Sequence, residues 1–225
     1  MASIKALFLN CSLKSSPRVS NTQALIDKTA AVLSSLSVES ESVRVVDCKV
    51  AFGSGMDEGD GDGWPALLDK IRAAEILVVA TPIWLGERSS VAKMVSERLD
   101  ATTYQNDSRN QHEMYGKVAG ALVTGESDGG QACIKSILYD LSIAGFTVPP
   151  NADCYWVGEA GLGGPYLESD GDTSIFVNER VRWMAHNMTY MAQLLKKHPI
   201  PTDLVKLSGE ADAISRPPKP KPTRG

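Results

Sequence analysis

The chain has 225 residues, of which 43% are hydrophobic and 22% charged, enough to bury a core in one or two domains. Its net charge of −4 at pH 7 argues against an affinity of the whole chain for nucleic acid or anionic membranes. No apolar run has the length of a membrane-spanning helix, and Ala6–Leu9 is too short an apolar core for a signal peptide.

Apolar periodicity predicts five strands that alternate with five helices. In chain order they are a strand at Ile4–Asn10, a helix at Asn21–Leu36, a strand at Ser42–Asp47, a helix at Trp64–Ala74, a strand at Glu75–Thr81, a helix at Ser90–Asp100, a strand at Lys117–Thr124, a helix at Gln131–Ala144, a strand at Ala152–Val157 and a helix at Thr173–Lys197. Ser20 with Gln23 three residues later has the form of a capping box, so Ser20 is the expected N-cap of the first helix.

This alternation indicates an α/β fold with a parallel, doubly wound sheet and helices on both faces. We expect one domain over residues 1–197. Residues 198–225 are rich in proline and contain no aromatic residue, so we expect a disordered tail there.

The cysteines and histidines give no sign of a metal site. Cys11, Cys48, Cys133 and Cys154 contain no C-x-x-C pair, and the chain has three histidines. The acidic stretch Gly53–Gly63 resembles an EF-hand loop in its spacing, but no helix precedes it and Pro65 falls inside the pattern. We predict reduced thiols in a cytoplasmic protein, a solvated acidic loop and no metal.

Three loops follow predicted strands and should meet at one edge of the sheet, where open α/β sheets bind ligands. The first, Cys11–Thr22, lacks glycine but offers the cation Lys14 and polar groups that lead into a helix N-terminus: Ser12, Ser15, Ser16, Ser20, Asn21 and Thr22. That chemistry suits a terminal phosphate monoester. The alternative is a serine-rich turn with an ordinary N-cap.

The second loop, Thr81–Gly86, exposes large apolar residues at the same edge. Trp84 and its neighbours would suit a flat aromatic ligand. Alternatively, Ile83 and Trp84 pack on the body of the protein or on a partner subunit.

The third loop, Thr124–Gly130, has two interpretations. Gly125–Gly129 fits the G-x-S-x-G nucleophile elbow with Ser127 as nucleophile, or the glycines form a turn that closes over a planar ring. The hydrolase interpretation needs a base from His186 or His198, and both are poorly placed, inside a predicted helix and at the start of the tail.

The motifs NCSLKSSPRVSNT (residues 10–22), ATPIWLGERSSVAKMVSERLD (80–100) and VTGESDGG (123–130) resemble those of the flavodoxin-like NAD(P)H-dependent FMN reductase and quinone reductase family. The resemblance extends over about residues 3–195 and implies strand order 2-1-3-4-5. The cysteine cluster of the family's iron–sulfur members is missing.

The resemblance also implies a site for FMN. The phosphate would bind the first loop, the ring and ribityl chain the second, and the pyrimidine side the third. The residues implied are Ser12, Lys14, Ser20, Asn21, Thr22, Pro82, Ile83, Trp84, Leu85, Gly86, Thr124, Gly125, Glu126, Gly129 and Gly130.

The function implied is an oxidoreductase in which NADH or NADPH gives a hydride to bound FMN, and a quinone-like or other small acceptor then takes the electrons. No catalytic side chain is needed. The family implies a homodimer or homotetramer. The alternatives are a flavodoxin-like electron carrier, a serine hydrolase using Ser127, and an interaction protein on a degenerate flavodoxin fold.

Two long loops, 101–116 and 158–171, are expected to cap the flavin, shape the acceptor site or contact another subunit. His112 in the first of them is interpreted as a surface histidine rather than a proton donor.

Overall fold

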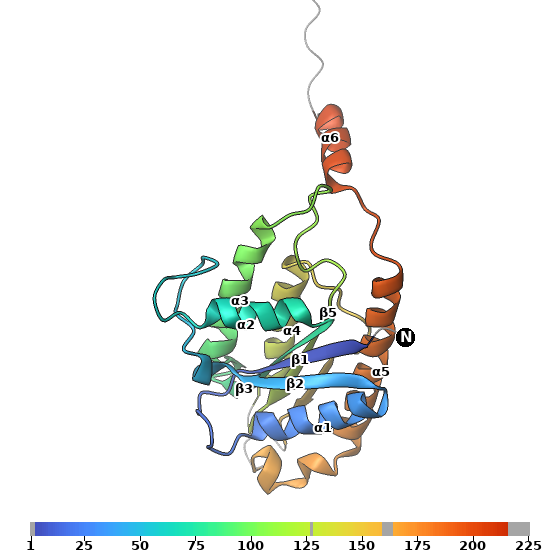
Figure 1. The fold of residues 1–225 in the computed structure, drawn as a ribbon. Coiled ribbons are helices and arrows are strands. Elements are labelled where there is room, and N and C mark those ends of the chain that lie inside the picture. The colour runs from blue at the N-terminus through green and yellow to red at the C-terminus, as the bar shows by residue number, and fades with distance from the viewer. Residues whose placement is uncertain (1–2, 127, 159–163, 216–225) are drawn as a thin grey trace, which may run out of the picture.

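A computed structural model describes residues 3–126, 128–158 and 164–215 of the protein (Figure 1). The strands are β1 Ile4–Asn10, β2 Val38–Arg44, β3 Ile76–Trp84, β4 Glu87–Arg88, β5 Val118–Thr124 and β6 Asp153–Trp156. The helices are α1 Asn21–Ser35, α2 Trp64–Ala73, α3 Ser90–Asp100, α4 Gly130–Ile143, α5 Ile175–Lys197 and α6 Leu204–Ser215. Short 3₁₀ turns lie at Val45–Cys48, Ala101–Tyr104, Tyr166–Glu168 and Asp170–Asp172.

The five long strands pair in parallel in the order β2-β1-β3-β5-β6. This is the predicted order 2-1-3-4-5, counted over long strands alone, and the prediction of a flavodoxin-like doubly wound sheet is confirmed. The additional strand, β4, pairs antiparallel with the end of β3 in a short hairpin.

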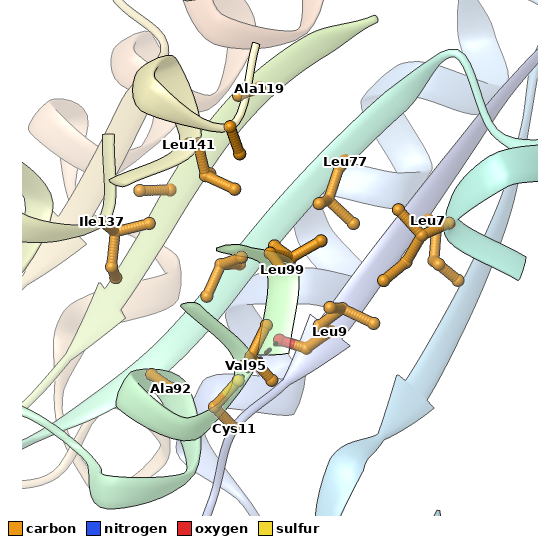
Figure 2. Close-up of a cluster of buried hydrophobic side chains, with 14 of the residues drawn as sticks. Leu7, Leu9, Cys11, Leu77, Ala92, Val95, Leu99, Ala119, Ile137 and Leu141 are labelled. Carbon is orange, nitrogen blue, oxygen red and sulfur yellow. Dashed lines mark hydrogen bonds between the residues drawn. The ribbon is translucent and has the colours of Figure 1, made fainter. Parts of the chain in front are cut away.

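A separate apolar cluster covers each face of the sheet because successive strand residues point to opposite sides. Figure 2 shows Leu9 of β1 beside Val95 and Leu99 of α3, and Leu7 belongs to the same cluster, which also includes α2 and α4 residues. Phe8 of β1 points to the other face, where α1 and α5 complete the second cluster.

The second strand lies closer to the N-terminus than predicted. It was expected at Ser42–Asp47, but β2 spans Val38–Arg44, and Val45 is buried in the 3₁₀ turn that follows. This strand is the edge of the sheet and its middle is exposed, so it is polar where a buried strand would be apolar. Of the valines that suggested the strand, Val43 lies in β2 and Val45 is buried in the turn.

The C-terminal segment also differs from the sequence-based expectation. Residues 204–215, predicted to be disordered, form α6, which extends away from the sheet (Figure 1). This stretch contains no proline, whereas the prolines that made the tail unsuited to structure lie on either side of it. Residues 216–225 lie outside the described residues. The boundary of a domain over residues 1–197 stays a prediction.

The acidic loop before α2 is fixed by a buried ion pair. Arg98 of α3 donates to Asp62 at 2.7 Å, with side chains 0% and 1% exposed, and to the carbonyl of Ala51 at 2.7 Å. Asp62 also accepts from the backbone amides of Ala51, Glu58 and Trp64. The Asp62 carboxylate is thus fully hydrogen-bonded within the fold and serves a structural role. Within the described residues, no cluster of three His, Cys, Asp or Glu side chains could hold a metal ion.

No helix in the described part of the chain combines the length and apolar character needed to cross a membrane.

Replacing Asp62 tests how much this pair contributes. Asp62→Ala leaves the buried Arg98 without a counterion and should lower the free energy of unfolding by about 3–5 kcal/mol in urea titrations. The matched control is Glu97→Ala, which removes the exposed ion pair Lys93–Glu97 of the same helix and should cost about 0–1 kcal/mol. Similar losses for the two variants would contradict the assignment.

The same pair predicts a pH dependence. Burial raises the pKa of Asp62, but hydrogen bonds from Arg98 and the three amides lower it by more, so the net pKa lies below its ordinary value. The stabilisation is therefore fully present above the unfolded pKa of about 4 and is lost as the pH falls toward the folded value. The stability difference between wild type and Asp62→Ala should shrink in acid.

Candidate functional site

The carboxyl ends of β1, β3 and β5 open into one cavity of about 410 Å³. Its walls come from the three predicted loops and from one further segment. The lining residues are Ser12, Leu13, Lys14, Ser20, Asn21, Thr22, Pro82, Ile83, Trp84, Leu85, Thr124, Gly125, Glu126, Pro165 and Tyr166. All predicted site residues line it except Gly86, Gly129 and Gly130. The binding roles of these residues stay predictions.

The first loop is organised by Asn10, a fully buried side chain at the end of β1. Its carbonyl oxygen accepts from the Ser12 amide at 3.0 Å, and its Nδ2 donates to Gln23 Oε1 at 2.8 Å. Ser20 caps α1 as predicted, because its hydroxyl accepts from the Gln23 amide at 3.2 Å. The Gln23 side chain does not close the capping box but bonds to Asn10, which fixes the loop against the helix.

The start of α1 has the electrostatics of an anion site. Its first turn contains no acidic residue, so the partial positive charge of the helix N-terminus is not neutralised locally. Asn21 and Thr22 of this turn line the cavity together with Lys14. On the outer side of the loop, Asp47 accepts from the Ser16 amide and Arg44 donates to the Arg18 carbonyl at 2.8 Å. These two hydrogen bonds fix the backbone of the first loop, which we call the anion cradle together with the start of α1.

The second loop is a hairpin between β3 and β4. Its two central residues, Leu85 and Gly86, have φ of 51° and 81°, as in the tight turns favoured between antiparallel strands. Leucine rarely adopts this conformation, and Leu85 is fully exposed at the cavity rim beside the half-exposed Trp84. Strain and exposed apolar surface coincide at this turn, which favours a contact with a ligand or partner there.

The third loop packs directly on this hairpin. Gly129 has φ of 124°, and a Cβ on it would lie 2.4 Å from the carbonyl oxygen of Gly86. A Cβ on Gly125 would overlap the Ile83 side chain. Gly86 and Gly129 therefore position two walls of the cavity without lining it. A Cβ on Gly130 would meet the Tyr155 ring, so this glycine too serves packing.

A buried hydrogen bond of 2.8 Å between the hydroxyls of Thr22 and Thr124 joins the first and third loops. It links two residues that are 102 positions apart in the chain, at the base of the cavity. The separation of the first loop from the third is thus fixed, which sets the width of the site between them.

The segment after β6 supplies a wall that the motifs did not identify. Pro165 and Tyr166 line the cavity, and the Leu167 amide donates to Asn21 Oδ1 at 2.9 Å. The Tyr166 ring is buried edge-on to Trp156, and burial raises the pKa of its hydroxyl, which stays protonated at neutral pH. The only sequence signal was the length of loop 158–171. Residues 159–163 lie outside the described residues.

The other long loop, 101–116, lies at the opposite edge of the sheet, because it leads into the amino end of β5. His112 belongs to a separate depression there, and its Nδ1 lies 2.9 Å from the side-chain amide of Asn106, which donates to it. The expectation that this loop caps the ligand is not met in the described structure.

The hydrolase alternative gains no support from the described residues. Ser127 lies outside them, and none of the described residues that line the cavity is a histidine. His186 is exposed on α5 and His198 lies at the end of that helix.

Comparison with known proteins agrees with this geometry. A family model described as NADPH-dependent FMN reductase matches residues 4–160. The 8-demethyl-8-aminoriboflavin-5'-phosphate synthase of Streptomyces davaonensis is 39% identical over 210 residues, which cover 89% of this chain and 82% of that protein.

Two solved structures extend the comparison. RosB, crystallised with the bound intermediate 8-demethyl-8-formylriboflavin-5'-phosphate, is 38% identical with a TM-score of 0.87, over 95% of this chain and 88% of that one. An archaeal flavodoxin, 13% identical with a TM-score of 0.51 over 84% of this chain and 99% of that one, shares the fold.

The contact between the two glycine turns can be tested by substitution. Gly129→Ala should destabilise the protein by roughly 1–3 kcal/mol more than Gly61→Ala. Both positions have positive φ, but a Cβ on Gly61 would meet nothing within 4 Å, so the pair isolates the overlap with Gly86. The measurement is chemical unfolding of both variants. Equal losses would contradict a close contact between the loops.

Proposed function

Because this chain belongs to the NADPH-dependent FMN reductase family, we propose that it binds FMN in the cavity and passes a hydride from NADH or NADPH to a small acceptor such as a quinone. The proposal rests on one observation: the first loop, which suits an anion, and the apolar hairpin between β3 and β4 line the same cavity. The family and its flavin-related members support a flavin enzyme, and the acceptor is inferred from the openness of the site.

The residues present suit FMN. A phosphate suits the first loop, where Lys14 and the hydroxyls of Ser12 and Thr22 converge on an unneutralised helix N-terminus. A flat ring suits the space between the hairpin and the third loop, beside Trp84 and Ile83. The cavity volume of about 410 Å³ lies in the usual range of 300–1,000 Å³ for cofactor sites.

In this proposal the protein itself binds and orients the flavin. When bound, the flavin supplies the capacity to accept and donate a hydride. The backbone of Thr124–Glu126 borders the cavity, and its glycine allows close approach to a ligand. Lys14, Glu126 and Tyr166 are the titratable groups among the described lining residues, and none is paired with a histidine in the manner of a general base.

The acceptor would enter past the hairpin. Trp84 and Leu85 present apolar surface at the open rim, which suits a planar apolar molecule such as a quinone. We further propose that the protein works in the cytoplasm as a homodimer or homotetramer.

A second candidate follows from the two relatives that are 38–39% identical over most of the chain. The first is named for the synthesis of a riboflavin phosphate changed at position 8, and the structure of the second holds another such derivative as an intermediate. In this proposal the flavin would itself be the substrate. The two candidates share a binding mode and differ in the fate of the flavin.

The phosphate cradle predicts a specific effect of Lys14. Lys14→Ala should raise the dissociation constant for FMN roughly 10- to 100-fold, because a charge-assisted contact contributes about 1.5–3 kcal/mol. Riboflavin, which lacks the phosphate, should be affected much less. Lys135→Ala on the exposed face of α4 is the matched control and should bind FMN as wild type does. Fluorescence titration measures all three, and an equal effect on riboflavin would contradict the phosphate role.

The reaction itself is tested by absorbance under anaerobic conditions. The FMN-loaded protein should lose its yellow colour when NADPH or NADH is added and regain it on addition of a quinone. Mass spectrometry of flavin extracted after a parallel aerobic incubation with an amine donor separates the two candidates: an unchanged FMN mass supports the reductase, and an altered mass supports flavin modification. Failure to bind FMN at micromolar concentration would contradict both.

A further inference from the structure

Helix α6 has no packing partner within the described part of the chain. None of its residues, Leu204–Ser215, is buried, and the helix extends beyond the end of α5 (Figure 1). Isolated helices of this length are marginal in water, and Gly209 near the centre lowers the helix propensity further. A helix of this kind is expected to be stabilised by packing against another surface.

The sequence of α6 defines the face that would pack. Leu204, Leu207, Ala211 and Ile214 follow at intervals of three, four and three residues, so they lie on one side of the helix. Ile214 is 86% exposed. The opposite side, around Ala213, carries no large apolar residue apart from Val205 at its margin.

The base of α6 is held firmly. Gln111, a buried side chain, donates from Nε2 to the carbonyls of Ile200 at 2.9 Å and Thr202 at 2.6 Å. The Leu204 amide donates to the Arg109 carbonyl at 2.9 Å, and Arg109 donates to Ile200. These bonds attach the start of α6 to the loop before β5, and the rest of the helix projects away from the sheet. We call α6 the arm.

A matching surface lies on α5. Phe176, Trp183, Tyr190 and Leu194 are exposed and follow a spacing of seven, seven and four residues, which forms one apolar stripe along the helix. Arg180 stacks on the rings of Phe176 and Trp183, at 5.4 and 5.5 Å. In the described structure α6 of the same chain does not cover this stripe.

The two helices have opposite net charge. Helix α5 contains four basic residues and one acidic residue, Glu179, for a net charge of +3. Residues 203–215 contain one basic residue, Lys206, and three acidic residues, for a net charge of −2. Two helices that each carry an exposed apolar stripe and have opposite net charge are complementary.

We propose that α6 is an exchanged arm: its stripe packs on the α5 stripe of a second copy of this chain, and the second copy returns the same contact. Such a reciprocal contact closes with twofold symmetry. Both stripes lie beyond residue 160, outside the part of the chain that the family model matches. Because the arm starts from the edge of the sheet opposite the cavity, exchange leaves the cavity open.

The test is sedimentation velocity of the full chain over a range of concentrations. Wild type should be at least dimeric, and Leu207→Glu and Ile214→Glu should each raise the dissociation constant on the order of 100-fold. Ala213→Glu makes the same charge change on the other side of α6 and should leave assembly unchanged. Trp183→Glu or Tyr190→Glu on α5 should weaken assembly as the arm variants do.

Three results would overturn the proposal. They are a monomeric wild type, an Ala213→Glu variant as weak as Leu207→Glu, and dimers that persist when both Trp183 and Tyr190 carry glutamate. Thermal unfolding and FMN binding of each variant establish that it is folded. FMN binding is independent of the assembly result because the cavity lies at the other edge of the sheet. Assembly itself raises the thermal midpoint, so the thermal readout is the presence of one cooperative transition rather than its temperature.

Discussion

The parallel pairing of β1 with β3 and of β3 with β5 is the constraint on which the site depends. Parallel strands end at the same edge, so loops that are distant in the chain start side by side. Residues near 12, 82 and 124 thus enclose one cavity. The alternating burial of β1, with Leu7 and Leu9 on one face and Phe8 on the other, fixes this register because a one-residue slip would exchange the faces.

Two contacts fix the distances between the loops that surround the cavity. The Thr22–Thr124 hydrogen bond joins the first and third loops, and the backbone contact of Gly129 with Gly86 joins the third loop to the hairpin. Each fixes one wall relative to another, which is what a preorganised cofactor site requires. The C-terminal arm is anchored at Arg109 and Gln111, at the other edge of the sheet, so the proposed assembly and the proposed ligand binding would use separate surfaces.

Sequence patterns predicted the parallel sheet, the Ser20 cap and the three loops that enclose the cavity, because these depend on local polarity and on the edge where parallel strands end. The strand order and the individual site residues came from the resemblance to a known family. Patterns failed where long-range contacts decide. The edge strand β2 is polar because it has one neighbouring strand, and Tyr166 reaches the cavity through its contact with Trp156. Gly86 and Gly129 pack closely against each other, which no pattern indicated, and their expected place beside a ligand stays a prediction. Helix α6 was missed because prolines dominate the composition of the tail around it.

The most direct test of the central claim is hydrogen–deuterium exchange with and without FMN. FMN should slow exchange in residues 12–22, 82–86, 124–126 and 164–167, the segments that surround the cavity. Loop 105–111 and α6 should exchange as before. Protection centred on another part of the surface, or none at all at saturating FMN, would contradict the site described above.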